Sequence, residues 1–246
     1  SSTAVAVFAI AVQIRSIFFS MSTTMSSVFI PQINRIVAET DDNTILTRLM
    51  TRVGRYQMII FWYLFGGFIV LGQYFVRIWA GEANSDAYWL CLIMVFPVMI
   101  PLTQNTGIEI QRAKNRHKVR SLIYILTSAI DIVISVLLIP LYGYWATAIG
   151  YVTSIVLGTG LFMNWYYHTR IGLNMLYFWK HQLPTVGLAV MTITVCLLGG
   201  FVLPVSSVSL FLIWGMIYTL LFGIGAMKVS LTQEERKKIL NRLKRK

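Results

Sequence analysis

The hydrophobic positions of this chain fall into seven long apolar stretches separated by short polar segments. Each stretch has about 20 residues, the length that an α-helix needs to cross a bilayer. None shows the two-residue alternation of a membrane β-strand, so we predict helices, whose backbone groups are hydrogen-bonded within the segment. The stretches span residues 3–30, 56–78, 87–110, 122–141, 144–167, 183–203 and 208–227.

The composition supports the same fold class. Hydrophobic residues make up 57% of the chain and charged residues 12%, with a mean hydropathy of +0.68. A soluble domain carries about 25% charged residues. We therefore predict an all-α fold, a polytopic membrane helix bundle with seven transmembrane helices.

The basic residues alternate between the two sides of the predicted membrane. All 21 Lys and Arg residues, except Arg15 and Arg77, follow the first, third, fifth or seventh stretch. The positive-inside rule then places residue 1 outside and the C-terminus in the cytoplasm. The net charge of +12 is thus a topology signal, and we expect no nucleic-acid partner. Arg77 lies at the outer end of its stretch, where it can extend to the headgroups and anchor the helix.

An odd number of spans that begins outside, without a basic leader, indicates a piece of a longer protein. We expect at least one further span upstream. Both cysteines, Cys91 and Cys196, lie in apolar spans and indicate neither a disulfide nor a metal site.

Two polar segments have amphipathic patterns. Residues 39–55 predict a short helix at the interface that runs into the second span. After the last span, Thr232 and Glu235 form a capping-box pattern, and the basic tail 229–246 is predicted to rest on membrane lipids. The apolar side of that tail is Ile239, Leu240 and Leu243.

Other spans carry packing signals. Gly150, Ser154 and Gly158 are four residues apart, which predicts close approach of a neighbouring helix. Pro97 and Pro101 each remove a backbone hydrogen bond and predict kinks.

Arg15 is one of two ionisable residues deep in a predicted span. Such a residue costs about 2.5–3.5 kcal/mol at a helix centre, so it must face protein or water. On a helical wheel Arg15 shares a face with Ser22 and Ser26, and Gln13 lies in the preceding turn. A permanent guanidinium beside hydroxyls suits a phosphorylated or acidic cargo. The alternative is an ion pair that holds helices together, for example with Asp131.

Asp131 lies on a polar stripe with Tyr124, Thr127, Ser128 and Ser135. A carboxyl poised between desolvation and a nearby Arg can bind H⁺ or Na⁺ during a transport cycle, so Asp131 is a candidate for ion coupling. A structural ion pair is the alternative. Glu109, beside Arg112, is a second candidate, with an interfacial ion pair as its alternative.

The pattern contains no enzyme or metal constellation. The three histidines lack acidic or cysteine partners at metal-ligand spacing, and we find no glycine-rich phosphate loop. We expect no catalytic residue, no metal, no cofactor and no enzymatic activity.

Several segments in order resemble a known transporter family. They are residues 4–11, residues 28–33 (Val-Phe-Ile-Pro-Gln-Ile), residues 78–81 (Ile-Trp-Ala-Gly), residues 113–118 (Ala-Lys-Asn-Arg-His-Lys) and residues 141–149 (Leu-Tyr-Gly-Tyr-Trp-Ala-Thr-Ala-Ile). With this order and spacing, the chain resembles the polysaccharide (O-antigen and teichuronic-type) flippases of the multidrug/oligosaccharidyl-lipid/polysaccharide exporter superfamily.

The resemblance implies a two-lobe transporter that works by alternating access. Residues 1–168 would be five helices of the second lobe, residues 169–228 two additional helices, and residues 229–246 the cytoplasmic tail. The N-terminal lobe of the same protein would be missing. The implied cargo is a polyprenyl-pyrophosphate-linked oligosaccharide, with Arg15 on its anionic headgroup and Gln13, Ser22, Gln104 and Asn105 on polar groups.

From these observations we expect a flippase of the bacterial inner membrane, with H⁺ or Na⁺ coupling as an open question. One alternative is a multidrug or metabolite exporter of the same superfamily. Others are a membrane glycosyltransferase or polymer ligase, against which the short outer loops argue, and a scaffold that does not transport.

Overall fold

The computed structural model describes residues 2–40 and 42–237, with the side chains of residues 2, 3 and 22 excepted, and its described residues form helices only. Seven helical segments are long and apolar enough to cross a membrane, which confirms the predicted all-α polytopic bundle. They are Ala4–Ser27, Asn43–Ala80, Glu82–Ala113, Lys118–Tyr142, Trp145–Ile171, Met175–Val202 and Val208–Ser230.

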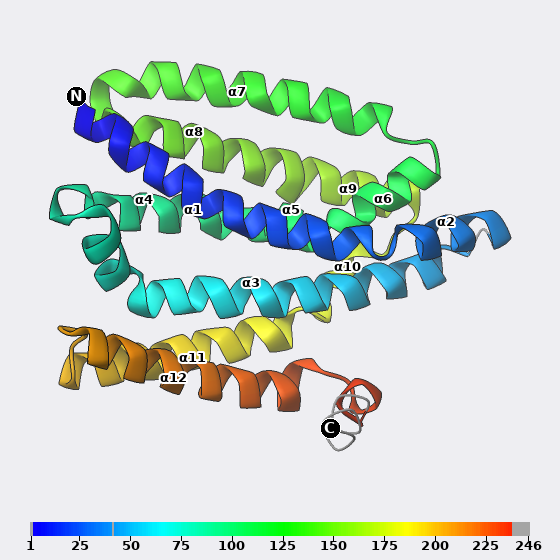
Figure 1. Ribbon diagram of the computed structural model, residues 1–246. Coiled ribbons are helices and arrows are strands. Elements are labelled where there is room, and N and C mark those ends of the chain that lie inside the picture. The colour runs from blue at the N-terminus through cyan, green and yellow to red at the C-terminus, as the bar shows by residue number, and fades with distance from the viewer. Residues whose placement is uncertain (1, 41, 238–246) are drawn as a thin grey trace.

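Successive spans run in opposite directions, so their connections gather at the two ends of the bundle (Figure 1). One end holds the start of α1 (Ser2–Ser27) and the three connections that lack Lys and Arg. The opposite end holds the basic connections and the start of the tail. The basic and the non-basic connections therefore lie at opposite ends of the folded bundle, as the charge pattern predicts.

One amphipathic helix was not predicted: α2 (Ile30–Glu39), whose Ile33 is fully buried, packs on α6. The helix predicted over residues 39–55 begins at Asn43 and runs into the second span as expected, and the two form one 38-residue helix, α3 (Asn43–Ala80). Asp42 caps its first turn by accepting a hydrogen bond from the Thr44 amide at 2.8 Å. No proline lies between Asn43 and the apolar stretch that starts at Tyr56, so one helix continues through the polar segment and the span.

The third span is segmented near its prolines, as predicted. It consists of α4 (Asp86–Val95), a 3₁₀ turn at Phe96–Val98, α5 (Met99–Thr103) and α6 (Asn105–Ala113). Gln104 has non-helical backbone angles and separates the last two pieces. α1 packs along α4.

The α7–α8 pair packs closely through small residues, which confirms the predicted packing face. Helix α7 (Lys118–Tyr142) turns at Gly143, whose φ of 55° suits glycine, into α8 (Trp145–Ile155). Gly150 faces Asp131 and Ser135, and Gly158 faces Thr127. The span then continues through π-helical turns and α9 (Asn164–Tyr166) to residue 171.

The last two spans lie against α3. A short helix α10 (Met175–Lys180) leads into α11 (Leu183–Val202), and α12 (Val208–Gly225) returns. The Tyr218 hydroxyl donates to the Trp62 carbonyl at 2.8 Å in a buried position. After Ser230 the predicted capping box is present: the Thr232 amide donates to Glu235 at 2.9 Å, and the Glu235 amide donates to Thr232 Oγ1 at 3.4 Å. Ile239, Leu240 and Leu243 lie outside the described residues.

Candidate functional site

Helix α1 carries its polar side chains on the face that points away from the bundle. Its buried face is mainly apolar and includes Val7, Ala11, Ile14 and Phe18. The exposed face holds six polar residues at three- and four-residue intervals, so they form one stripe along the helix. These residues, which we call the α1 polar face, are Gln13, Ser16, Ser20, Thr23, Thr24 and Ser27.

The hydroxyls of the α1 polar face bond to their own helix. Each donates to a main-chain carbonyl three or four residues earlier, at 2.7–3.1 Å. Their donor protons are satisfied, while the oxygen lone pairs point outward as acceptors. The face therefore offers a row of hydrogen-bond acceptors to whatever covers it.

The outer faces of two other spans are mainly apolar, and α1 itself also exposes Ile17 and Met21 next to its polar face. The outer side of α7 is mainly Leu, Ile and Val, including Leu126, Ile132 and Leu137, and that of α12 includes Leu212 and Leu220. Such surfaces match lipid tails. The α1 polar face does not, because polar groups in a span turn toward protein or water.

Arg15 lies half-buried on the flank of α1 that faces α8, outside the α1 polar face. Its guanidinium carbon is 4.6 Å from the ring centre of Tyr151 on α8 and 5.9 Å from that of Phe19. Stacking on aromatic rings stabilises the cation without neutralising it. The Arg15 Nε atom is buried and has no hydrogen-bond partner among the described residues.

Asp131 of α7 also lies near Tyr151. Its carboxylate accepts a hydrogen bond from Ser135 at 3.2 Å and packs over Gly150. Tyr151 is in electrostatic reach of both Arg15 and Asp131. The two charges form no ion pair, and the ion pairs of the described residues join Arg35–Glu39, Arg55–Glu235, Arg77–Glu82 and Arg112–Glu109. The alternative in which Arg15 pairs with Asp131 is thus not what the described structure contains.

The sequence-based wall of Arg15, Ser22 and Ser26 is not an open surface. Ser26 is 1% exposed and accepts a hydrogen bond from Gln57 of α3 at 2.7 Å. The Ser22 side chain lies outside the described residues. Gln13 is exposed and belongs to the α1 polar face. The spacing of Gln13, Ser16, Ser20, Thr24 and Ser27, three or four residues apart, would have predicted this face from the sequence.

The polar residues predicted in the third span lie near its basic end. Gln104 is only 2% exposed, and its amide donates to Asn164 at 3.0 Å. The same Asn164 oxygen accepts from Trp179 at 2.7 Å, so Gln104 is part of an interhelical network rather than an accessible wall. Asn105 is half-buried. Glu109 forms the expected ion pair with Arg112, at 2.8 Å.

Sequence reasoning did not anticipate the contact between α3 and the start of the tail. Arg55 and Glu235, 180 residues apart, form an ion pair at 2.7 Å. Their separation in sequence left no local signal. Among the described residues, no group of three or more His, Cys, Asp or Glu could hold a metal ion.

Comparisons of the chain with protein-family models, with curated proteins and with solved structures each find no match. The flippase resemblance therefore remains a prediction from the sequence.

Proposed function

We propose that this chain is part of a membrane exporter that moves a polyprenyl-pyrophosphate-linked oligosaccharide outward by alternating access. The observation that carries the proposal is the α1 polar face, together with Arg15 on the flank of the same helix that faces α8. In this proposal α1 lines the water-filled pathway along which the oligosaccharide passes.

The dimensions of the face suit this role. Residues 13 to 27 of a helix extend over about 21 Å, two-thirds of the hydrocarbon thickness of a bilayer. Sugar hydroxyls are donors that match the outward lone pairs of Ser16, Ser20 and Thr24. A pathway of weak, repeated hydrogen bonds lets a hydrophilic cargo slide without a deep binding minimum.

Arg15 supplies the anion contact in this proposal. Its guanidinium is permanently charged, is stacked on Tyr151 and has no carboxylate partner among the described residues, so a pyrophosphate can bind it. Gln13 lies on the same open face. Gln104 is left out of the pathway because it is buried in its interhelical network, and Glu109 because Arg112 already pairs with it. Asp131 remains a proposed ion-coupling residue.

We place the protein in a bacterial inner membrane with its basic connections in the cytoplasm. The support is the positive-inside rule together with the gathering of these connections at one end of the bundle (Figure 1). A cargo assembled in the cytoplasm would enter at that end.

Cysteine accessibility tests the water-filled face. Single cysteines at Ser16, Ser20 and Thr24 should react with a hydrophilic maleimide in intact membranes, whereas cysteines at Ile132, Val136 and Leu137 of α7 should not. The two sets are matched because both are solvent-accessible in the isolated bundle. Native Cys91 and Cys196 are buried and give a low background. If the α1 cysteines are protected from the maleimide as well as the α7 cysteines are, the α1 polar face does not line a water-filled pathway.

An export assay tests the cargo. In cells whose surface polysaccharide depends on the intact protein, Arg15→Ala should lower export roughly tenfold or more, because a charge-assisted hydrogen bond is worth about 1.5–3 kcal/mol. Lipid-linked oligosaccharide should accumulate on the inner leaflet. Arg15→Lys should retain part of the activity, and Arg77→Ala, at the outer end of α3, should retain all of it. Normal export by Arg15→Ala would contradict the assignment, and altered drug tolerance without accumulation would favour the drug exporter.

A further inference from the structure

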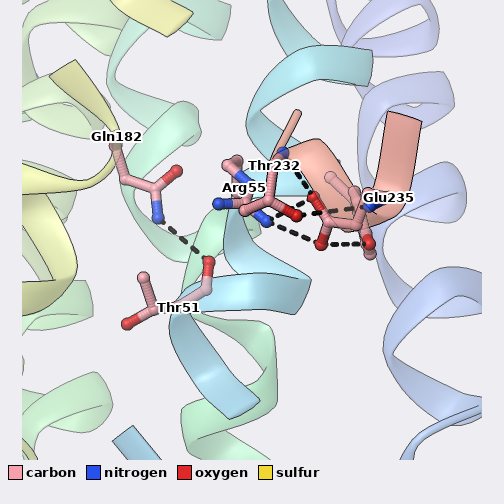
Figure 2. Close-up of polar contacts among 6 residues, drawn as sticks. Thr51, Arg55, Gln182, Thr232 and Glu235 are labelled. Atoms are coloured by element: carbon pink, nitrogen blue, oxygen red, sulfur yellow. Dashed lines mark hydrogen bonds and ion pairs between the residues drawn. The ribbon is translucent and has the colours of Figure 1, made fainter. Parts of the chain in front are cut away.

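The carboxylate of Glu235 is held by four hydrogen bonds at the basic end of the bundle (Figure 2). Arg55 Nη2 donates to both Glu235 oxygens, each at 2.7 Å. The Tyr56 hydroxyl donates to Oε1 at 2.6 Å, and the Thr232 amide donates to Oε2 at 2.9 Å. The Arg55 and Glu235 side chains are only 12% and 15% exposed.

Two of these donors belong to α3 and exist without the tail. A guanidinium beside a phenol hydroxyl can donate hydrogen bonds to a carboxylate or to a phosphate. We call Arg55 and Tyr56 the α3 anion site. In the structure this site is filled by a residue from the chain's own C-terminal segment.

Little else fixes that segment on α3. Thr232, Gln233 and Glu234 are exposed. Arg236 donates to the carbonyls of Met227 and Lys228, at 2.8 and 2.7 Å, and so bonds to its own span rather than to α3. Glu235 provides the hydrogen bonds described between residues 231–237 and α3. The hydrogen bonding of this segment to α3 thus depends on one carboxylate.

The surroundings favour exchange of this carboxylate for another anion. The site lies at the end of the bundle where the basic connections gather (Figure 1), and Arg55 directly precedes the apolar stretch 56–78. Phospholipid phosphates lie at such an end of a membrane span. The residues from Arg236 onward are rich in Lys and Arg, which anionic headgroups attract. Breaking the pair outright would leave a buried guanidinium unpaired, whereas exchange keeps it paired throughout.

We propose that the α3 anion site is a phosphate-binding site which Glu235 occupies as an internal ligand. A phosphate group, from an anionic phospholipid headgroup or from free phosphate, displaces Glu235 and releases the segment after Ser230. The proposal does not depend on the transported cargo.

Spin labels on the full chain in lipid nanodiscs test this exchange. Labels at Arg48→Cys and Gln233→Cys, both exposed positions, with Cys91 and Cys196 replaced by Ala, report the distance between α3 and the segment. In phosphatidylcholine we expect one short distance. An equal mixture with phosphatidylglycerol should make a longer, broader distribution the major population. Inorganic phosphate added to phosphatidylcholine discs tells whether free phosphate suffices.

Three variants distinguish displacement of Glu235 by a phosphate from a general loosening of the segment after Ser230. Glu235→Gln should give the long distribution in both lipids, and the neighbouring exposed Glu234→Gln should behave as the wild type. Arg55→Gln should also release the segment, with no further response to anionic lipid or phosphate. A short distance that persists in Glu235→Gln, or a wild type that ignores both phosphatidylglycerol and inorganic phosphate, would overturn the proposal.

Discussion

At the scale of single residues, Gly150 of α8 is packed tightly against α7. A Cβ added there would lie 2.7 Å from the Asp131 carbonyl oxygen and closer still to Ser135 Oγ and Asp131 Oδ1. We expect Gly150→Ala to destabilise the bundle by about 1–3 kcal/mol, because overpacking forces the helices apart. Thermal unfolding in detergent measures the change.

Gly187 of α11 is the matched control, since nothing lies within 4 Å of a Cβ built there. Gly187→Ala should be neutral or slightly stabilising, because alanine favours the helix. Equal destabilisation by both substitutions would show that α7 and α8 do not pack closely at Gly150.

Glu235 gives the chain a contact that acid should weaken. Burial alone would raise the pKa of Glu235, but hydrogen bonds from Tyr56 and Thr232, with the Arg55 charge, outweigh it and hold the pKa below its ordinary value of 4.5. The stability from this carboxylate is thus complete above the ordinary value and is lost as pH falls through the lowered one. As the pH falls from about 7 to below the ordinary pKa of 4.5, the wild type should progressively lose its stability advantage over Glu235→Gln. Parallel pH profiles of the two proteins would contradict this assignment.

Residue identities in α1 were easier to predict than the direction in which they face. Arg15 stood out because a charge inside an apolar span is rare in any arrangement. Ser26 was grouped with Arg15 by helical geometry, but whether that side is covered depends on α3, which supplies Gln57. The open side of α1 is fixed by its neighbours and not by α1 itself.

At the scale of elements, α12 depends on α3 through a buried hydrogen bond. The hydroxyl of Tyr218, whose side chain is 2% exposed, donates to the Trp62 carbonyl. Tyr218→Phe should cost about 1 kcal/mol, the usual net value of such a bond. Tyr63→Phe is the control, because the bond from Tyr63 to Thr219 is exposed and should contribute less. Unfolding midpoints of the two variants in the same detergent would be compared, and an equal effect would contradict the ranking.

Apolar length predicted which elements exist, and polar signals predicted their boundaries less well. All seven spans could be predicted because an uninterrupted apolar run of about 20 residues is rare outside membrane-spanning helices. Residues 39–55 were assigned to one amphipathic helix, although α2 ends at Glu39 and α3 begins at Asn43. Amphipathic spacing is the same in an interfacial helix and in the aqueous extension of a span, so spacing cannot distinguish them.

At the scale of the whole molecule, the two ends of the bundle should face different compartments. Cysteines at Ser85 and Ser206, both exposed at the end that lacks basic connections, should react with an impermeant maleimide added to intact cells. A cysteine at the exposed Thr169 should react only after the membrane is opened. Labelling of Thr169→Cys in intact cells would contradict the orientation that the charges predict.

Global arrangement was predicted only in part. The charge pattern determined which connections share an end, because it acts through each connection alone. The packing of α11 and α12 on α3, and the contact between Arg55 and Glu235, depend on side-chain fit between distant segments, for which one sequence holds no signal.

The unbroken length of α3 has a mechanical consequence. A helix of 38 residues is about 57 Å long, nearly twice the hydrocarbon thickness, and it has no internal break at which to bend. Arg55 lies about a third of the way along it and Ala80 at its far end. A tilt of about 10° about its basic end would displace the far end by about 10 Å. Events at the headgroup surface on one side of the membrane can thus be transmitted through α3 to the other side.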